Sequence, residues 1–148
     1  MKTRISIIFL IVAVPLLATT SVYASPGQDF YLEKVCPSLT NPNACDIVVA
    51  DPPFEGLVGG LVVYDDLVYW ANPAGYEFEI ARVEVTTGDN DGMVTGQIRW
   101  IKDHGLFTFR QGSGSLDNLY ATGRVDFLGV DLDGHYRFSL TGTYHIEP

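Results

Sequence analysis

Residues 135–146 read HYRFSLTGTYHI, and this stretch decides the fold class. From Tyr136 to Ile146, apolar, aromatic or glycine positions alternate with polar ones. A two-residue period is the pattern of a β-strand that buries one face and exposes the other to water. The stretch therefore predicts a long strand whose aromatic face points toward a core.

Shorter alternating segments precede this strand, separated by turns rich in Gly, Asp and Asn. The clearest turns are residues 89–92 and 131–134, where Asn and Gly tolerate the positive φ of tight hairpins. Residues 65–75 are expected to form a loop, and a slip in the apolar phase predicts a bulge near Ala81 and Arg82. No window supports a long amphipathic helix, so the chain reads as an all-β antiparallel meander.

Without helices to cover a sheet, an antiparallel closed barrel of about eight strands buries the apolar face and removes exposed strand edges. A two-sheet β-sandwich is the alternative. The 148 residues allow one domain with a sizeable core. We expect a signal peptide at residues 1–24, an N-terminal segment at residues 25–55 and the barrel body at residues 56–148.

The first 24 residues have the pattern of an export signal. Lys2 and Arg4 precede an apolar run of about 14 residues, which is shorter than the roughly 20 needed to span a bilayer. Small residues at positions 22 and 24 predict cleavage after Ala24. We therefore expect a secreted or periplasmic protein with no membrane span after cleavage; an uncleaved membrane anchor is the alternative.

Cys36 and Cys45 are the only two cysteines, and an even count in an exported chain favours a disulfide. A redox or metal-binding pair is the alternative, but the spacing is not Cys-x-x-Cys and no His lies nearby. The pair would close a short loop near the N-terminus of the mature chain.

The chain is acidic, with 9 basic and 18 acidic residues and a formal charge of −9. Residues 1–24 contain two basic residues and no acidic one, so their removal would leave a charge of −11. Such a surface repels phosphate backbones and anionic lipid headgroups, which disfavours nucleic acid and acidic membranes as partners. The sequence does not indicate an oligomeric state.

Aromatic residues dominate the face of the strands that we expect to point inward. They either pack the core or line a cavity for a small hydrophobic molecule. Weak catalytic candidates are Glu79 and Arg82, should the expected bulge turn either one inward. His104, His135 and His145 are too widely spaced for a transition-metal site, and we expect neither metal nor cofactor. The candidate ligand-binding residues are Tyr76, Phe78, Trp100, Phe107, Phe109, Phe127, Tyr136, Phe138 and Tyr144.

The segment at residues 107–123, FTFRQGSGSLDNLYATG, resembles the allene oxide cyclase-like barrels, as does the closing Gly142-Thr143-Tyr144-His145. These barrels include plant allene oxide cyclases, dirigent proteins and secreted bacterial relatives, and the resemblance covers roughly residues 56–148. It implies a calycin-like, eight-stranded antiparallel barrel with an apolar cavity. In the enzyme members, such a cavity shapes a reactive intermediate for isomerisation, cyclisation or coupling without a cofactor. None of their catalytic residues matches a particular position here.

Together these features predict a secreted barrel that binds a small hydrophobic ligand. By resemblance alone, it would be a cofactor-independent isomerase or cyclase if it is an enzyme. The alternative is a noncatalytic extracellular interaction or structural module, which would make its contacts through the outer strand faces. A filled interior would favour this module, and an open cavity facing an ionisable side chain would favour the enzyme.

Overall fold

A computed structural model of the chain describes residues 27–39, 43–71, 73–74, 77–101 and 103–147. The expected signal peptide and its cleavage site lie outside these residues, and so does Tyr76.

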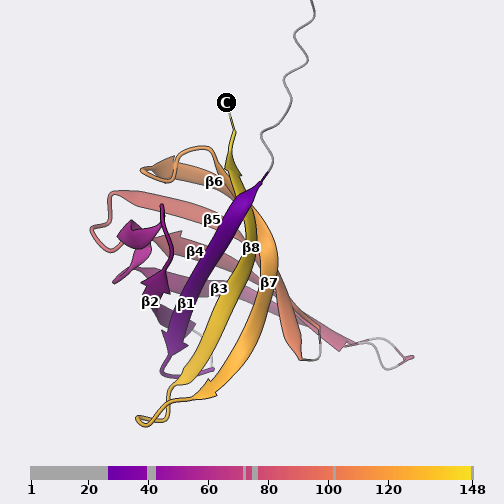
Figure 1. Cartoon of the computed structure of the whole chain (residues 1–148). Helices are drawn as coiled ribbons and strands as arrows, with labels where there is room; N and C mark the ends of the chain where they lie inside the picture. Colours follow the sequence, from indigo (N-terminus) through magenta and orange to yellow (C-terminus); the bar gives the residue numbers. More distant parts are fainter. Residues whose placement is uncertain (1–26, 40–42, 72, 75–76, 102, 148) are drawn as a thin grey trace, which may run out of the picture.

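The described residues form one closed antiparallel barrel, with its strands in sequence order (Figure 1). Each strand pairs with its neighbours in the sequence, and β1 closes the ring by pairing with β8 over nine residues. The all-β barrel prediction is confirmed, and the two-sheet sandwich is wrong. The strands are β1 (Gln28–Cys36), β2 (Asn43–Ala50), β3 (Leu61–Ala71), β4 (Glu77–Thr86), β5 (Gly92–Ile101), β6 (His104–Gly114), β7 (Leu119–Val130) and β8 (Tyr136–Ile146), with a short 3₁₀ helix η1 (Glu55–Leu57) between β2 and β3.

The barrel begins earlier than the expected boundary at residue 56. β1 and β2 lie in the segment assigned to the N-terminus, and both are integral strands. The inward side of β1 carries Phe30 and Leu32, but then Lys34. Lys34 is a charged residue at an inward position, where the alternation would otherwise have an apolar side chain. This break in the pattern explains why the strand is not evident from the sequence.

The bulge lies in β3, whereas the sequence predicted it in β4 near Ala81 and Arg82. The register of β3 against β4 shifts between Asp65 and Val68, and Asp66 has a φ of 49°. β3 therefore continues to Ala71, so the expected loop over residues 65–75 is also wrong for residues 65–71. β4 pairs with β5 without interruption.

One end of the barrel is filled by aromatic side chains, and we call it the plugged end. It holds η1, the β4–β5 and β6–β7 turns and the C-terminus of β8. The Phe54 ring, just before η1, lies 5.2 Å from the Phe30 ring and 4.6 Å from the Tyr144 ring, centroid to centroid. Phe107 and Phe109 complete this packing, with ring centroids 4.8 Å apart. The interior is therefore solid core at this end.

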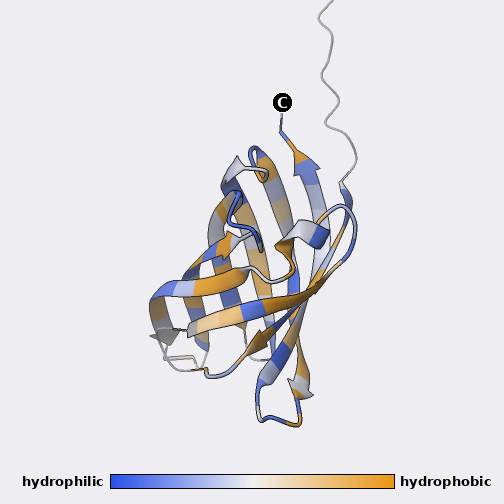
Figure 2. Cartoon of the chain, turned by 90° about the vertical axis from the view of Figure 1, so that its left-hand side faces the viewer, coloured by the Kyte–Doolittle hydropathy of each residue, from blue (hydrophilic) through white to orange (hydrophobic). Residues whose placement is uncertain are grey.

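The opposite end, which we call the hairpin end, carries the β3–β4, β5–β6 and β7–β8 connections and the end of β1. The β3–β4 hairpin projects away from the barrel at the lower right of Figure 1. Along the strands, hydrophobic and hydrophilic residues alternate (Figure 2). Exposed apolar side chains gather on the β7–β8 hairpin, where Phe127, Leu128, Val130 and Leu132 are all at least half exposed.

Cys36 and Cys45 form a disulfide that joins the end of β1 to β2, with an S–S distance of 2.03 Å. The disulfide prediction is confirmed. Both cysteines are fully buried and belong to the inner face of the barrel. The bond therefore fixes the hairpin end of the first two strands against each other.

We expect replacement of both Cys36 and Cys45 by alanine to lower the free energy of unfolding by about 2.5–3 kcal/mol, because the unfolded chain would lose a closed loop of roughly ten residues. Urea denaturation of the oxidised protein and of this double variant measures the difference. The same loss should follow reduction of the wild-type protein by a thiol reagent. An unchanged urea midpoint in both experiments would contradict a stabilising role.

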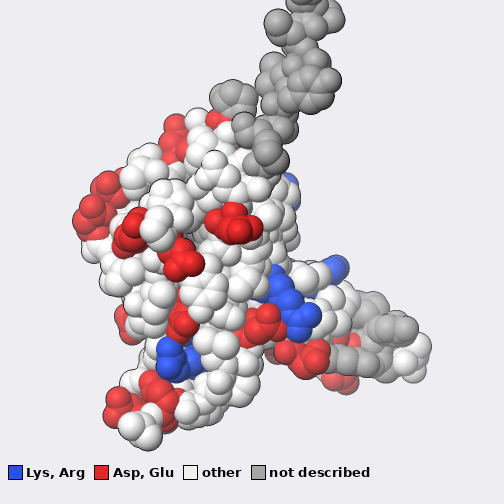
Figure 3. Space-filling model, viewed as in Figure 1, with Lys and Arg blue, Asp and Glu red and all other residues white. Residues whose placement is uncertain are grey.

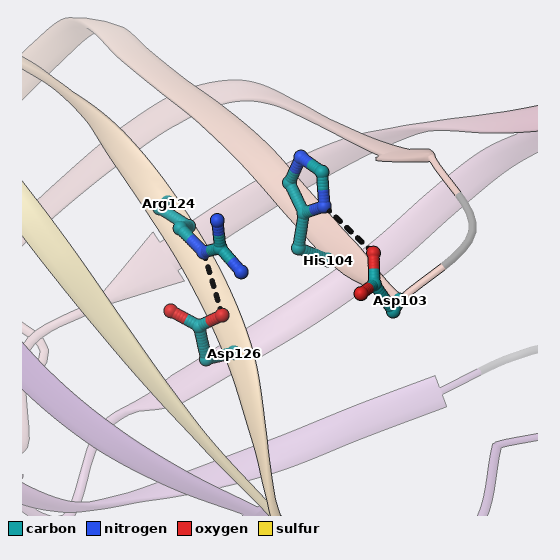
Figure 4. A network of polar contacts seen from close by, with 4 residues as sticks. All are labelled: Asp103, His104, Arg124 and Asp126. Carbon is teal, nitrogen blue, oxygen red and sulfur yellow. Dashed lines mark hydrogen bonds and ion pairs between the residues drawn. The ribbon is translucent and has the colours of Figure 1, made fainter.

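Charged side chains cover the outside. Red acidic residues are prominent on the face shown in Figure 3, in agreement with the charge of −9. Figure 4 shows two polar pairs on β6, β7 and the turn before β6. His104 Nδ1 lies 3.0 Å from Asp103 Oδ1, and Arg124 Nε donates to Asp126 Oδ1 at 2.6 Å. His104, Arg124 and Asp126 lie on the outer faces of β6 and β7, whereas Phe107 and Val125 lie on the buried inner faces. Both pairs therefore belong to the solvated surface.

Candidate functional site

A lysine lies inside the barrel near the hairpin end. Lys34 is only 1 % exposed, and it shares the inner face of β1 with Leu32 and Cys36. Its neighbour across β1 and β8 is Phe138. A lysine is almost never fully buried unless it is paired, so its surroundings decide whether it has a role.

The amine of Lys34 contacts four groups, of which three lie on other strands and one, Cys36, lies on β1 itself. Nζ donates a hydrogen bond to Tyr64 Oη, and it lies 3.8 Å and 3.7 Å from the Sγ atoms of Cys36 and Cys45. It also lies 4.3 Å from the centroid of the Tyr64 ring and 4.9 Å from that of Phe138. We call these groups, namely Lys34, Tyr64, Phe138 and the disulfide, the lysine site.

The amine has no carboxylate partner within the ranges that the structure describes, where the ion pairs involve only His and Arg cations. Sulfur is a weak hydrogen-bond acceptor and the two aromatic rings offer only their faces. A charged ammonium here is therefore poorly compensated.

Burial shifts the acid–base behaviour of both polar groups. Loss of hydration lowers the pKa of Lys34 from 10.5 to about 7. The same effect raises the pKa of the Tyr64 phenol well above its usual value of 10. Near neutral pH, a large fraction of Lys34 is an uncharged amine, and the Tyr64 hydroxyl keeps its proton. The site thus holds a nucleophilic nitrogen and a proton donor in direct contact.

Aromatic side chains connect the lysine site to solvent. The Phe138 ring centroid lies 5.5 Å from that of Trp100 and 5.4 Å from that of Phe127. Phe127 in turn lies 6.5 Å from Tyr136. Phe138 is 6 % exposed and Phe127 is 50 % exposed, so this wall runs from the rim of the barrel down to the amine.

The predicted aromatic residues therefore divide into separate groups. Phe107, Phe109 and Tyr144 belong to the packed core of the plugged end. Trp100, Phe127, Tyr136 and Phe138 lie together at the hairpin end. Phe78 lies on the other face of β4 from buried Ala81, so the expectation that it faces inward is wrong. The reason is that the bulge lies in β3, and β4 keeps a single phase.

The two weak catalytic candidates are far from equivalent. Glu79 is half-buried, pairs with Trp100 across β4 and β5, and shares the inner register with Ala81. Arg82 is exposed on the outer register, opposite Asp65 and Gln97. The structure gives Arg82 no place in the interior.

A hollow of ≈ 520 Å³ opens at the plugged end. Its walls include Phe54, Leu116 and Tyr144, together with the carboxylates of Asp89 and Asp91. Asp91 accepts hydrogen bonds from the side chains of Thr87 and Ser115, which fold the β4–β5 turn against the β6–β7 turn. Lys34 is not part of this hollow, so it is a surface depression above the packed core.

Within the described ranges, no three His, Cys, Asp or Glu residues come close enough to hold a metal ion. The two Asp-Gly turns are hairpin connections, as predicted, between β4 and β5 and between β7 and β8. His135 lies 3.7 Å from Asp131, and the His145 ring stacks beside Tyr120.

Sequence reasoning missed Lys34 and Tyr64. The signal for Lys34 was present in the strand pattern, because Lys34 has the same parity as Phe30, Leu32 and Cys36. Recognising it required the assignment of residues 28–36 as a strand, and the lysine itself obscured that assignment. Tyr64 lies in a stretch that is apolar on both faces, where a two-residue period gives no orientation.

Comparison of the chain with protein-family models, curated proteins and solved structures finds no match. No helix among the described residues is long and apolar enough to cross a membrane.

Proposed function

We propose that this protein is an exported barrel that binds a small, mainly apolar molecule at its hairpin end, with Lys34 contacting a carbonyl or carboxylate oxygen of the ligand. The observation that carries this proposal is the position of the amine. It lies inside the barrel, against aromatic rings and a disulfide, without a carboxylate partner among the described residues.

The energetics support a functional role for this amine. An apolar side chain of similar volume would avoid the cost of removing an ammonium from water, which is several kcal/mol even after relaxation. Residues with strongly perturbed ionisation are concentrated at functional sites. A ligand oxygen would supply the acceptor that the protein does not provide, while the wall of Trp100, Phe127 and Phe138 would contact the apolar part of the ligand.

Other features are consistent with export and with this class of function. The disulfide and the basic–apolar pattern of residues 1–24 suit an extracellular or periplasmic location. The resemblance to allene oxide cyclase-like barrels suggests a cofactor-free isomerase or cyclase. In such a reaction, the Tyr64 hydroxyl and Lys34 would polarise a substrate oxygen.

A noncatalytic interaction module is the second candidate. The packed plugged end and the exposed apolar side chains of the β7–β8 hairpin favour it, because both would suit a barrel that makes contacts from outside. Ligand titration separates the two functions.

The test titrates the purified protein with three ligands of equal chain length, namely decanoate, decanal and decanol, and follows tryptophan fluorescence. Trp100 contacts the wall that would bind the ligand, so we expect a saturable change for all three. Lys34→Met should weaken the binding of decanoate by about tenfold or more, because a charge-assisted hydrogen bond is lost. The binding of decanol should change less.

Arg124→Met is the matched control, because it also removes one cation, but from the outer surface. It should bind all three ligands as the wild type does. If none of the ligands changes the fluorescence or binds in calorimetry, the ligand-binding function is wrong and the interaction module is favoured. Equal loss of decanoate binding in both variants would show that Lys34 acts only through net charge.

A further inference from the structure

We propose that Lys34 binds aldehyde ligands covalently, as a reversible imine on its Nζ atom, with Tyr64 moving the protons. This inference rests on the proposed ligand-binding function and names the substrate class of the same site. It goes further because it requires bond formation and not only contact with a ligand oxygen.

The position of the amine meets the requirements of imine formation. The nucleophile must be an uncharged amine, and burial away from carboxylates produces this form near neutral pH. A proton donor must lie within reach of the carbonyl oxygen, and the Tyr64 hydroxyl is in contact with Nζ. The site must also exclude water, which hydrolyses imines, and Lys34 is 1 % exposed.

The carbonyl carbon would reach Nζ along the aromatic wall. Phe138 covers the amine on one side, and its neighbour Phe127 is half exposed at the rim. An apolar aldehyde would reach the amine by displacing the Phe138 ring, and its chain would then lie against Trp100, whose ring contacts Phe138. The sulfur atoms of Cys36 and Cys45 do not compete as nucleophiles, because they are bonded to each other in the disulfide.

The reaction balances without an oxidant or a cofactor. The Nζ lone pair forms a bond to the carbonyl carbon, and the C=O π electrons move to oxygen. Tyr64 gives its proton to this oxygen and regains one from nitrogen, which yields a neutral carbinolamine. A second proton passes from nitrogen to the hydroxyl group by the same route, the C–O bond breaks, and water leaves. The products are one C=N bond and one water molecule.

The test traps the imine by reduction. The full-length protein is incubated at pH 7 with decanal and sodium cyanoborohydride, and the alkylated lysine is identified by peptide mass spectrometry. The chain has lysines only at positions 2, 34 and 102, so the assignment is direct. We expect labelling of Lys34 to exceed that of Lys102 by about tenfold or more, because burial leaves a large fraction of the Lys34 amine uncharged at this pH.

Two variants make the result specific. Lys34→Arg keeps a cation but cannot form an imine, so it should abolish the dominant label; Lys102→Arg should leave it unchanged. Tyr64→Phe should slow trapping by about tenfold or more, since general acid–base catalysis typically contributes at least this factor. Binding of decanol by Arg124→Met, measured by calorimetry, should equal that of wild type, because Arg124 lies on the outer surface away from the lysine site.

The outcomes separate this inference from the function on which it rests. Saturable decanol binding without enrichment of the label at Lys34 would overturn the imine and leave the ligand-binding function standing. Absence of both would overturn both. Trapping by Tyr64→Phe at the wild-type rate would overturn the role of Tyr64 as the proton carrier.

Discussion

Replacing Lys34 by methionine is expected to stabilise the barrel at pH 7 by about 4 kcal/mol, which is the cost implied by a pKa lowered from 10.5 to about 7. Methionine has a similar length and carries no charge, so it fits among Tyr64, Phe138 and the disulfide. Urea denaturation at equilibrium measures the gain. This is the largest stabilising effect that we expect from any single substitution.

The gain should depend on pH in a defined direction. Below pH 7, Lys34 is protonated in both the folded and the unfolded chain, and the full cost of burying the charge is present. Between pH 7 and 10.5, the unfolded chain holds a proton that the folded chain has released, so wild-type stability rises with pH. The advantage of Lys34→Met should therefore shrink to about 2 kcal/mol at pH 9.

Measurements are best kept below pH 9.5, because the tyrosines add an opposite trend. The pKa of Tyr31 is raised to about 12 by its hydrogen bond to Glu33, and that of Tyr64 is also raised. Above pH 10 these phenols ionise first in the unfolded chain, which lowers stability in both proteins. A constant difference between wild type and Lys34→Met from pH 6 to 9 would show that the amine is not desolvated as described. Arg124→Met should show no such pH-dependent gain.

Alanine at Gly142 is expected to destabilise the barrel by about 3 kcal/mol or more, because the added methyl group meets backbone atoms that cannot move independently. Gly142 lies opposite Gly123 in the β7–β8 ladder. A Cβ at Gly142 would lie 2.1 Å from the Thr122 carbonyl oxygen and 2.6 Å from the Gly123 Cα. The two strands would have to separate, and this would disturb the inner face on which Phe138 lies.

Gly56→Ala is the matched control, since a Cβ there meets nothing within 4 Å. We expect its urea midpoint to stay near that of wild type. A Gly142→Ala protein with a similarly small change would show that β7 and β8 can relax around the methyl group.

Much of the fold follows from local pattern. The alternation in residues 136–146, the Asp-Gly turns and the absence of helical periodicity predict an all-β antiparallel fold that covers one apolar face, but they leave both a closed barrel and a two-sheet sandwich open. The disulfide follows from cysteine count and expected export. The segments that were predicted wrongly are those where the alternation is broken, namely β1 by Lys34 and β3 by its bulge between Asp65 and Val68.

The candidate site was much less accessible to prediction. Four of the nine aromatic residues do line the hairpin end, but their grouping depends on which end of the barrel each strand position occupies. The two-residue period shows which face of a strand a side chain occupies, but it does not show at which end of the barrel that side chain lies. Phe107, Tyr144 and Phe138 share the inner face and belong to one buried core. Their ring neighbours differ, since Tyr144 packs on Phe54 at the plugged end and Phe138 packs on Trp100 and Phe127 at the hairpin end.

The sequence by itself determined that the chain is acidic, all-β and antiparallel, with an aromatic inner face, because composition, turn residues and a two-residue period act locally. Only the tertiary structure decided that the strands close into a barrel and that the inner face holds a buried lysine near the hairpin end. The reason is physical: the ionisation and reactivity of Lys34 depend on its distance from water and on Tyr64, Phe138 and Cys45, which come from other strands. Barrel closure brings these groups together, and the local sequence pattern of a single strand cannot predict contacts between strands.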